Sequence, residues 1–478
     1  MAEDDRAPLS VFADVPAFAR GLAFDRLPDE VAASARRSLL DLIGIAAAAS
    51  RTRAAAIAGA YAATQLRGEP SARILLDGRR ASLTGAAFAG ATTIDALDGH
   101  DGHVLTKGHA GAAVLPALLA LVDATDADAT VRTDGREFIA SLVLGYEVAT
   151  RAGIALHATV PDYHCSGAWN ALGCAALAAR FFGFDADRTR HALGMAEYFA
   201  PRGQIMRACE SPTMVKDGSG WGAHAGVTAA LLAREGFTGA PALTVEREDV
   251  ASLWNDLGVR WRITEQYFKA YLVCRWAQPA VEAVLELQRK HRFTADQIER
   301  ITIESFHEAV ALGSRCTLPR TTEEAQYSLA FPVAAALVFG RIGADEVGAR
   351  GLEDPRVARL LAAVEPVEDA EFTKLFPAER WARVRIALAD GRNLESRPAQ
   401  ARGGPENPLS DDELRAKYRE LATPVLGVAR ATRIEYAVAD LCRDLHGPLL
   451  DQLAAIEDGL IATPLDRRVE KSRKAAAR

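Results

Sequence analysis

Apolar residues recur with helical spacing through the first 270 residues of the chain. Alanine-rich runs of this kind predict helices at residues 31–49, 110–122, 138–156, 168–182 and 223–235. Glycine follows two of these runs, as Gly183 and Gly236, and glycine is common just beyond a helix C-terminus. Because β-branched and aromatic residues are sparse over this stretch, the pattern predicts an all-helical body.

Strand-like alternation begins only after this body. Isoleucines between 298 and 303 lie among charged neighbours, and residues 383–388 alternate before an Asp-Gly turn. Helical spacing returns after a Gly-Gly-Pro break at 403–405, where the sequence Leu-Ser-Asp-Asp-Glu at 409–413 is typical of a helix N-cap and an acidic first turn.

This order predicts a mainly α protein in which a smaller α+β domain is inserted into a large all-helical domain. The helical domain is expected to comprise residues 1–270 and 408–465, and the α+β domain residues 271–407. The segment 466–478 carries six basic side chains and is expected to be a flexible basic tail.

Composition narrows the classes of partner. The chain has 478 residues, with 63 acidic and 56 basic side chains and a net charge of −7. Because nucleic-acid binding depends on clustered lysine and arginine, no nucleic-acid partner is expected. The most apolar run, 39–49, is shorter than the about 18 residues that a membrane span requires, so no membrane partner is expected. An acidic amino terminus without a secretory pattern, and six cysteines without a CxxC pair, predict reduced thiols in a cytoplasmic protein.

Candidate chemistry concentrates in a polar, glycine-bearing segment, residues 95–109, between two predicted helices. Such a segment is typical of a functional loop held by a core, and a solvated connection without function is the alternative. Asp98, His100, Asp101 and His103 include metal-ligand types. The His-Asp pair resembles the metal-dependent HD phosphohydrolases, although the sequence shows no clear partner for the further histidine and aspartate that this chemistry needs.

Three candidate groups, His109, His164 and Lys216, share a local setting, since each precedes a glycine-containing turn and a predicted helix. Helix N-termini present unpaired N–H groups and positive potential, which suit carboxylate or phosphate. The same potential disfavours imidazolium, so both histidines are predicted to stay neutral and to serve as bases. Lys216 precedes its glycines and is therefore not part of a Walker A loop; a solvated loop lysine is the alternative.

A further cationic cluster lies at the predicted domain boundary, where Lys269 and Arg275 stand among aromatic residues just before a predicted helix. This arrangement is consistent with an anion clamp at a hinge and equally with a packed linker that exposes its charges. Cys274 has no nearby histidine in the sequence to activate it, so a buried thiol is favoured over a nucleophile.

Short motifs run in order along residues 39–441. They are Leu-Asp-Leu-Ile-Gly at 40–44, Asp-Ala-Leu-Asp at 95–98, Ala-Ala-Val-Leu-Pro-Ala at 112–117, Gly-Tyr-Glu-Val at 145–148, Tyr-His-Cys-Ser-Gly at 163–167, the run 226–239, Cys-Arg at 274–275 and Ala-Gln-Tyr-Ser-Leu at 325–329. In number and order these motifs resemble the MmgE/PrpD family of dehydratases, decarboxylases and epimerases. The resemblance implies a helical domain, a smaller lid domain, a homodimer, and an active site between the domains without cofactor or metal.

Matched position by position, the resemblance implies catalytic roles for Asp98, His109, His164 and Lys216. It implies substrate binding by Lys269, Arg275 and Tyr327, to which we add Asp101 and His103 as candidates from the same loop. The chain departs from the family's pattern around these positions, at His100-Asp101-Gly102, Ala110, Cys165-Ser166 and Gln278. These departures place methylcitrate itself in question as the substrate.

The leading hypothesis is a cofactor-independent lyase, a hydro-lyase of dehydratase type, that acts on a small di- or tricarboxylate. Cations would hold the carboxylates and stabilise an enolate, while one histidine abstracts the α-proton and the other, or a lysine, protonates the departing hydroxyl. Asp98 would orient or tune a histidine. An epimerase and a decarboxylase remain close alternatives because they share an enolate-like intermediate, and a metal-dependent phosphohydrolase is a more distant one.

Overall fold

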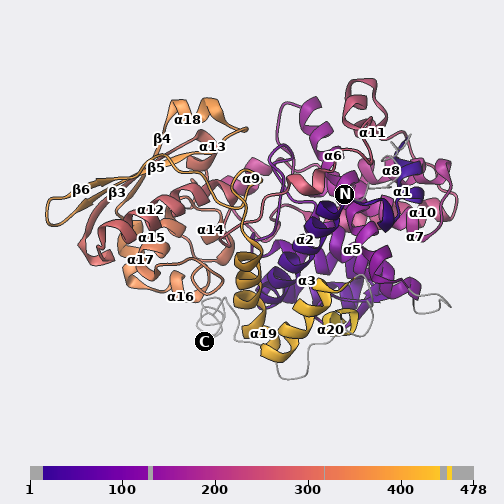
Figure 1. The fold of residues 1–478 in the computed structure, drawn as a ribbon, viewed down its shortest axis with the longest axis horizontal. Helices are drawn as coiled ribbons and strands as arrows, with labels where there is room; N and C mark the ends of the chain where they lie inside the picture. The colour runs from indigo at the N-terminus through magenta and orange to yellow at the C-terminus, as the bar shows by residue number, and fades with distance from the viewer. Residues whose placement is uncertain (1–13, 127–132, 317, 442–448, 455–478) are drawn as a thin grey trace, which may run out of the picture.

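The computed structural model describes residues 14–126, 133–316, 318–441 and 449–454. They form a helical part and a smaller part that carries a four-stranded sheet, lying side by side (Figure 1). The predicted fold class, mainly α with a smaller α+β part, is confirmed. The predicted basic tail, 466–478, lies outside the described residues.

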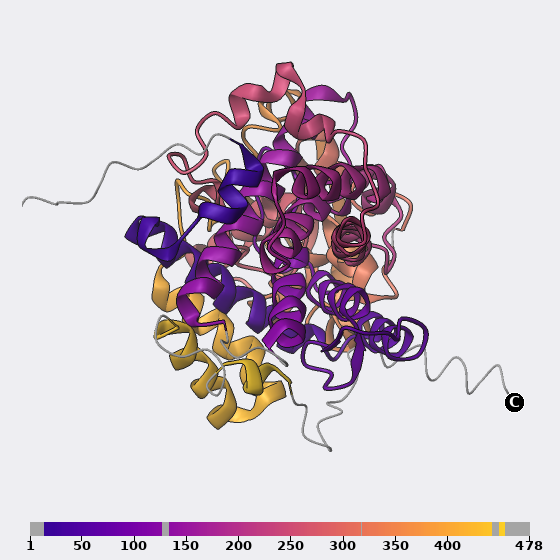
Figure 2. The same cartoon turned by 90° about the vertical axis from the view of Figure 1, so that its right-hand side faces the viewer.

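Long helices make up most of the helical part (Figure 2). The helices of this part before residue 270 are α1 (Val15–Gly21), α2 (Asp29–Ala49), α3 (Arg53–Gln65), α4 (Leu83–Asp95), α5 (Gly111–Asp126), α6 (Gly135–Thr159), α7 (Gly167–Phe181), α8 (Ala186–Phe199), α9 (Ile205–Glu210), α10 (Ser219–Arg234) and α11 (Leu243–Glu246). Short 3₁₀ turns of this part lie at Phe24–Arg26, Glu248–Leu253 and Arg262–Glu265, and a further one at Arg275–Ala277 begins the smaller part.

Helix α7 packs against α5, α6, α8 and α10. Small residues allow the backbones to approach closely. A Cβ at Gly226 of α10 would lie 2.2 Å from the Ala171 carbonyl oxygen of α7, and one at Gly173 of α7 would lie 2.5 Å from the Gly145 carbonyl oxygen of α6. Side chains this small permit close-packed helices, which gives the alanine-rich pattern its physical reason.

The part expected to be all-helical contains one short hairpin. Strands β1 (Ser71–Arg73) and β2 (Arg80–Ser82) pair antiparallel and pack against α4 and α5. Strands of three residues are too short to show the alternation by which a strand is recognised in a sequence, so the pattern missed them.

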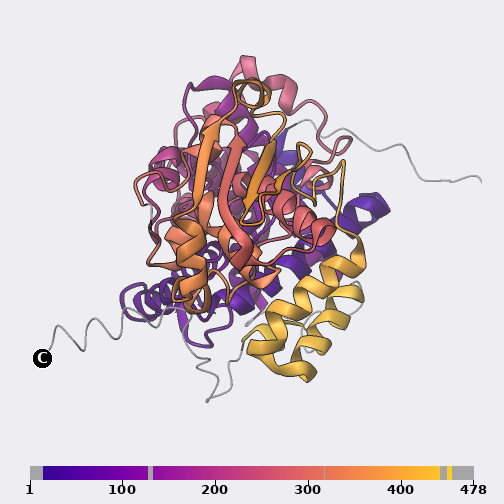
Figure 3. The same ribbon diagram turned by 90° about the vertical axis from the view of Figure 1, so that its left-hand side faces the viewer.

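The smaller part is built on a sheet with strand order β4-β3-β5-β6 (Figure 3). Strand β3 (Ile298–Ser305) runs antiparallel to β5 (Ala382–Leu388) and parallel to β4 (Val364–Glu368), while β6 (Asn393–Glu395) extends the other edge. The helices of this part are α12 (Gln278–His291), α13 (His307–Val310), α14 (Thr322–Gln326), α15 (Ala330–Phe339), α16 (Ala349–Leu352), α17 (Pro355–Leu361) and α18 (Ala370–Leu375), with a 3₁₀ turn at Ala295–Gln297.

The two strands predicted from alternation are β3 and β5, and both are confirmed. Edge strand β4 was not predicted, because most of its residues are exposed and it contains Pro366. Proline is tolerated at a sheet edge, where its missing N–H is not needed by a neighbour, so an edge strand can lack the pattern of a central one.

The chain returns to the helical part through α19 (Asp411–Ala439), which packs along α2 (Figure 1). The predicted N-cap is confirmed: the Ser410 hydroxyl accepts from the Glu413 N–H, and the Glu413 carboxylate accepts from the Ser410 N–H. The helix is interrupted at Gly427, whose φ is 72°, and α20 (Asp451–Ala454) follows.

Among the described residues, α6 is long and apolar enough to cross a membrane by length and composition. All of its apolar window is buried inside the protein. Packing against α2, α5 and α7 therefore accounts for its apolar sequence.

Candidate active site

The loop between α4 and α5, residues 96–110, runs through the core. Asp98, His100, Asp101, His103 and His109 are all buried. The loop pairs with the segment that follows the Arg262–Glu265 turn, where Gly102 and Tyr267 exchange backbone hydrogen bonds of 3.0 and 2.7 Å. This pairing joins the two sequence clusters that carried most of the candidate chemistry.

A pocket with an empty volume of about 350 Å³ opens beside this loop. Residues from both parts of the molecule line it: Asp98, Lys107, His109, Ile205, Cys209, Asp217, Tyr267 and Lys269 from the helical part, and Cys274, Arg275, Trp276, Tyr327 and Arg380 from the segment 271–407. Four lysine and arginine side chains stand against two carboxyl groups in this lining, so the pocket suits a small anionic molecule.

Asp98 and Lys269 form a buried ion pair at the pocket wall. The Lys269 Nζ lies 2.9 Å from the Asp98 Oδ1 and 2.8 Å from its carbonyl oxygen, and the Tyr327 hydroxyl donates to the same Oδ1 at 3.4 Å. Burial alone would raise the pKa of Asp98, but the ammonium groups of Lys269 and Lys216 outweigh it and lower that pKa. The pair is therefore held in its charged form.

Lys216 is buried and is not among the residues that line the pocket. Its ammonium group donates to the Gln326 side chain and stands 4.8 Å from the centre of the Tyr327 ring. Burial lowers the pKa of Lys216, although Asp98 opposes this shift. Lys216 therefore acts through its neighbours: its charge lowers the pKa of Asp98, and its ammonium group contacts the Tyr327 ring.

The His109 ring presents one nitrogen to the pocket. Its Nδ1 lies 2.5 Å from the Asp101 carbonyl oxygen, and since a carbonyl only accepts, Nδ1 carries the proton. Its Nε2 lies 3.5 Å from the Asp217 carboxyl and 3.9 Å from the Asp98 carboxyl. Burial, with the Lys269 charge next, lowers the pKa of His109 to about 3, so the ring is neutral and Nε2 has a free lone pair.

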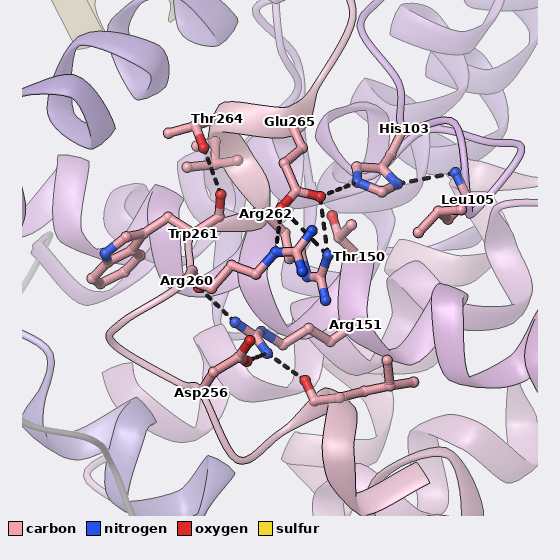
Figure 4. A network of polar contacts seen from close by, with 12 residues as sticks. His103, Leu105, Thr150, Arg151, Asp256, Arg260, Trp261, Arg262, Thr264 and Glu265 are labelled. Carbon is pink, nitrogen blue, oxygen red and sulfur yellow. Dashed lines mark hydrogen bonds and ion pairs between the residues drawn. The ribbon is translucent and has the colours of Figure 1, made fainter. Parts of the chain in front are cut away.

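Two predicted substrate-binding residues, Asp101 and His103, do not line the pocket. The Asp101 carboxyl accepts from the Tyr146 hydroxyl at 2.6 Å. The His103 Nδ1 accepts from the Leu105 N–H, so its Nε2 donates to Glu265 at 3.1 Å (Figure 4). Both side chains hold the loop in place, and the Asp101 main chain orients His109.

His164 also lies outside the pocket lining. Its Nδ1 faces the Arg202 carbonyl oxygen at 3.3 Å, and its Nε2 lies 3.5 Å from the Asp162 carboxyl. The neighbouring Tyr163 ring contacts Phe376 and Lys107, and Lys107 lines the pocket. The predicted catalytic role of His164 stays a prediction.

Three charged residues of the pocket were not predicted. Lys107, Asp217 and Arg380 line it; burial lowers the pKa of Lys107 to about 8. Arg380 lies in the chain just before β5 and donates to the Val104 carbonyl oxygen at 3.3 Å. Asp217 directly follows the candidate Lys216, which is the signal that could have drawn attention to it.

Two alternatives from the sequence are addressed by this geometry. Asp98, His100 and His109 offer three possible metal ligands within 4.8 Å of one another, but the Lys269 ammonium already neutralises Asp98, and its charge opposes a divalent cation there. Burial raises the pKa of Cys274 to about 12, so this pocket residue is a thiol at neutral pH, as the sequence favoured.

Fold and pocket together define a two-part protein with acid–base groups and cations around a buried site, the layout of an enzyme for a small anion. Residues 14–253 match the family model of the MmgE/PrpD N-terminal domain, and residues 271–442 match that of the MmgE/PrpD C-terminal domain. The chain therefore belongs to the MmgE/PrpD family, as its motifs suggested.

The chain is also similar to proteins named as cis-aconitate decarboxylases or as cis-aconitate decarboxylase-like. A cis-aconitate decarboxylase-like protein, oryM, of Aspergillus oryzae is 28% identical over 76% of this chain and 80% of its own length. Cis-aconitate decarboxylase of Aspergillus terreus is 26% identical over 94% of this chain and 97% of its own, and that of Mus musculus is 25% identical over 92% and 89%. Family and relatives support a lyase that acts on a carboxylate.

Proposed function

We propose that this protein is a cofactor-independent lyase that decarboxylates a small unsaturated tricarboxylate of the cis-aconitate type. The observation that carries the proposal is the pocket itself, where the His109 Nε2 lone pair faces a space ringed by Lys107, Lys269, Arg275 and Arg380. The names of the relatives favour decarboxylation over the dehydration expected from the sequence.

The pocket cations provide the binding energy for carboxylates. Arg275 and Arg380 enter from the smaller part, and Lys107 and Lys269 from the helical part. Charge-assisted hydrogen bonds to carboxylate are about twice as strong as neutral ones. A substrate with two or three carboxylates would therefore bridge the two parts, and their closure over it would exclude water.

His109 is the acid–base group of the proposed reaction. When the bond from carbon to the departing carboxylate breaks, carbon dioxide leaves and an electron pair stays on the substrate. The cations stabilise this charge through the remaining carboxylates. His109 takes up a proton at its free Nε2 and passes it to the carbon, which completes the product. The Asp98–Lys269 pair fixes one of these cations in position.

The direct test is product analysis by proton NMR in D₂O with purified enzyme. Cis-aconitate, citrate, 2-methylcitrate and a hydroxydicarboxylate would be supplied in turn, each once with chelator and once with added divalent metal. Loss of carbon dioxide and one deuterium in the product support the proposal. Loss of water without carbon dioxide establishes the dehydratase, exchange without net loss establishes an epimerase, and dependence on added metal contradicts cofactor independence.

We also propose a homodimer, as the family resemblance implied. Tyr198, Phe199 and Trp221 on α8 and α10 are 81, 44 and 47% exposed, and the last two line a surface hollow; clusters of this kind mark interaction surfaces. Light scattering should report two chains, and Trp221→Glu should shift the protein toward one chain. Tyr436→Glu, on α19 and 72% exposed, is the matched control and should stay dimeric.

A further inference from the structure

Asp217 is a buried carboxyl that faces the reactive nitrogen of His109. It lies in the turn before α10, where its main-chain oxygen accepts from the Gly167 N–H at 3.0 Å, and its side chain is 4% exposed. Its Oδ2 stands 3.5 Å from the His109 Nε2, the ring nitrogen without a proton.

One hydroxyl sets the relative position of these two groups. The Ser166 Oγ donates to the Asp217 Oδ2 at 3.1 Å and accepts from the His109 backbone N–H at 2.9 Å. Because Ser166 is itself buried, the arrangement is fixed before any substrate binds.

The surroundings of Asp217 favour its protonated form. Burial, followed by the negative charges of Asp95 and Asp98, raises the pKa of Asp217 to about 8, with Lys269 opposing. Other titratable groups that interact with this carboxyl include His109, Tyr327, Cys165, Cys209 and Cys274, and Lys216 precedes it in the chain. At neutral pH, therefore, one proton lies between the Asp217 carboxyl and the His109 Nε2, and it resides on Asp217.

We propose that Asp217 stores the proton that the lyase reaction consumes and passes it through His109 to the substrate carbon. Decarboxylation consumes one proton, because the carbon that loses carbon dioxide gains a hydrogen in its place. His109 takes the proton from Asp217 at Nε2, the breaking carbon–carbon bond leaves its electron pair on carbon, and that pair takes the proton from Nε2. Asp217 is left as a carboxylate and regains a proton from solvent. This inference rests on the proposed function.

The kinetic test is Asp217→Asn, which keeps the shape and an acceptor for Ser166 but cannot transfer the proton. We expect kcat to fall about a hundredfold, the scale of general acid catalysis, with little change in KM. In the wild type, kcat should fall as pH rises through about 8, where Asp217 loses its proton, and the variant should lack this decline. A variant with the wild-type decline, whatever its kcat, overturns the proposal.

Two further variants sharpen the test. Asp95→Asn removes the nearby charge that helps to raise the Asp217 pKa, so the decline of kcat should move to lower pH. The exposed Asp249, paired with Arg247, supplies the control, and Asp249→Asn should leave the profile unchanged. A profile unmoved in Asp95→Asn contradicts the assignment of the decline to Asp217.

A measurement without substrate separates this inference from the proposed function. Infrared difference spectra between pH 7 and pH 9 should show, in the wild type, the loss of a carboxylic acid band that Asp217→Asn lacks, beside the band of Asp101 that both proteins share. Absence of the Asp217 band at neutral pH overturns proton storage even if the enzyme is a decarboxylase. Its presence in an enzyme that turns over no polycarboxylate leaves the stored proton standing and rejects the proposed function.

Discussion

The turns that carry His109 and His164 begin two core helices, α5 and α7, and look alike in the sequence. His109 is enclosed, with its Nδ1 tied to the Asp101 carbonyl and its Nε2 turned toward the pocket carboxyls. The His164 side chain is 11% exposed and faces Asp162. The comparison shows that the role of a histidine at a helix start depends on distant chain segments, because the hydrogen bonds from these segments determine which ring nitrogen is free.

The largest expected effect is that of His109→Gln. Removing the group that moves the proton should lower kcat at least about a hundredfold, while circular dichroism and the thermal midpoint should stay near those of the wild type. Near-normal turnover by a folded variant would break the comparison, since His109 would then be no more catalytic than any buried histidine.

How much of this site was predictable depends on how local its signal was. Asp98, His109 and Lys269 stand out as polar groups in motifs between apolar helices, and the structure places all three in the pocket. Arg380 has no such signal. Its contact with Val104 spans 276 residues and exists only once both parts have folded, so no local periodicity could reveal it.

The fold shows the same division. Helices and central strands follow from periodicity because each buries one face, whereas the hairpin β1–β2 and the edge strand β4 bury too little to show a pattern. Asp101 and His103 show the limit for side chains. Their residue types suited substrate binding, but the Asp101 and His103 side chains are hydrogen-bonded to Tyr146 and Glu265, each far away in the sequence.

Arg380→Met tests whether the pocket beside His109 is where substrate binds. A hydrogen bond to a charged group contributes about 1.5–3 kcal/mol, so KM should rise roughly ten- to a hundredfold with a smaller change in kcat. Arg383→Met, on β5 and paired with Glu304, is the matched control and should leave KM unchanged. An equal rise in both variants would move substrate binding away from this pocket.

Asp101→Asn separates the two things that Asp101 does. Burial raises the pKa of its carboxyl to about 7, above the roughly 4 of an unfolded chain, so its charged form destabilises the native state increasingly as pH rises from about 4 to 7. The variant should therefore be more stable than the wild type at pH 8, by about 1 kcal/mol or more in denaturant unfolding, and the advantage should vanish near pH 4.

Turnover of Asp101→Asn should change far less than that of His109→Gln, because the His109 Nδ1 bonds to the Asp101 main-chain oxygen. Loss of activity as large as that of His109→Gln would show that the carboxyl itself takes part.

The smallest effect is expected for His164→Gln, the variant that bears most directly on the comparison. Since this side chain faces Asp162 and the Arg202 carbonyl and does not line the pocket, kcat should fall well short of the hundredfold that proton transfer supplies. Steady-state kinetics beside His109→Gln gives the answer. Equal losses in the two variants would mean that closure of the two parts turns His164 inward, and that both helix-start histidines serve the reaction, as the family resemblance implied.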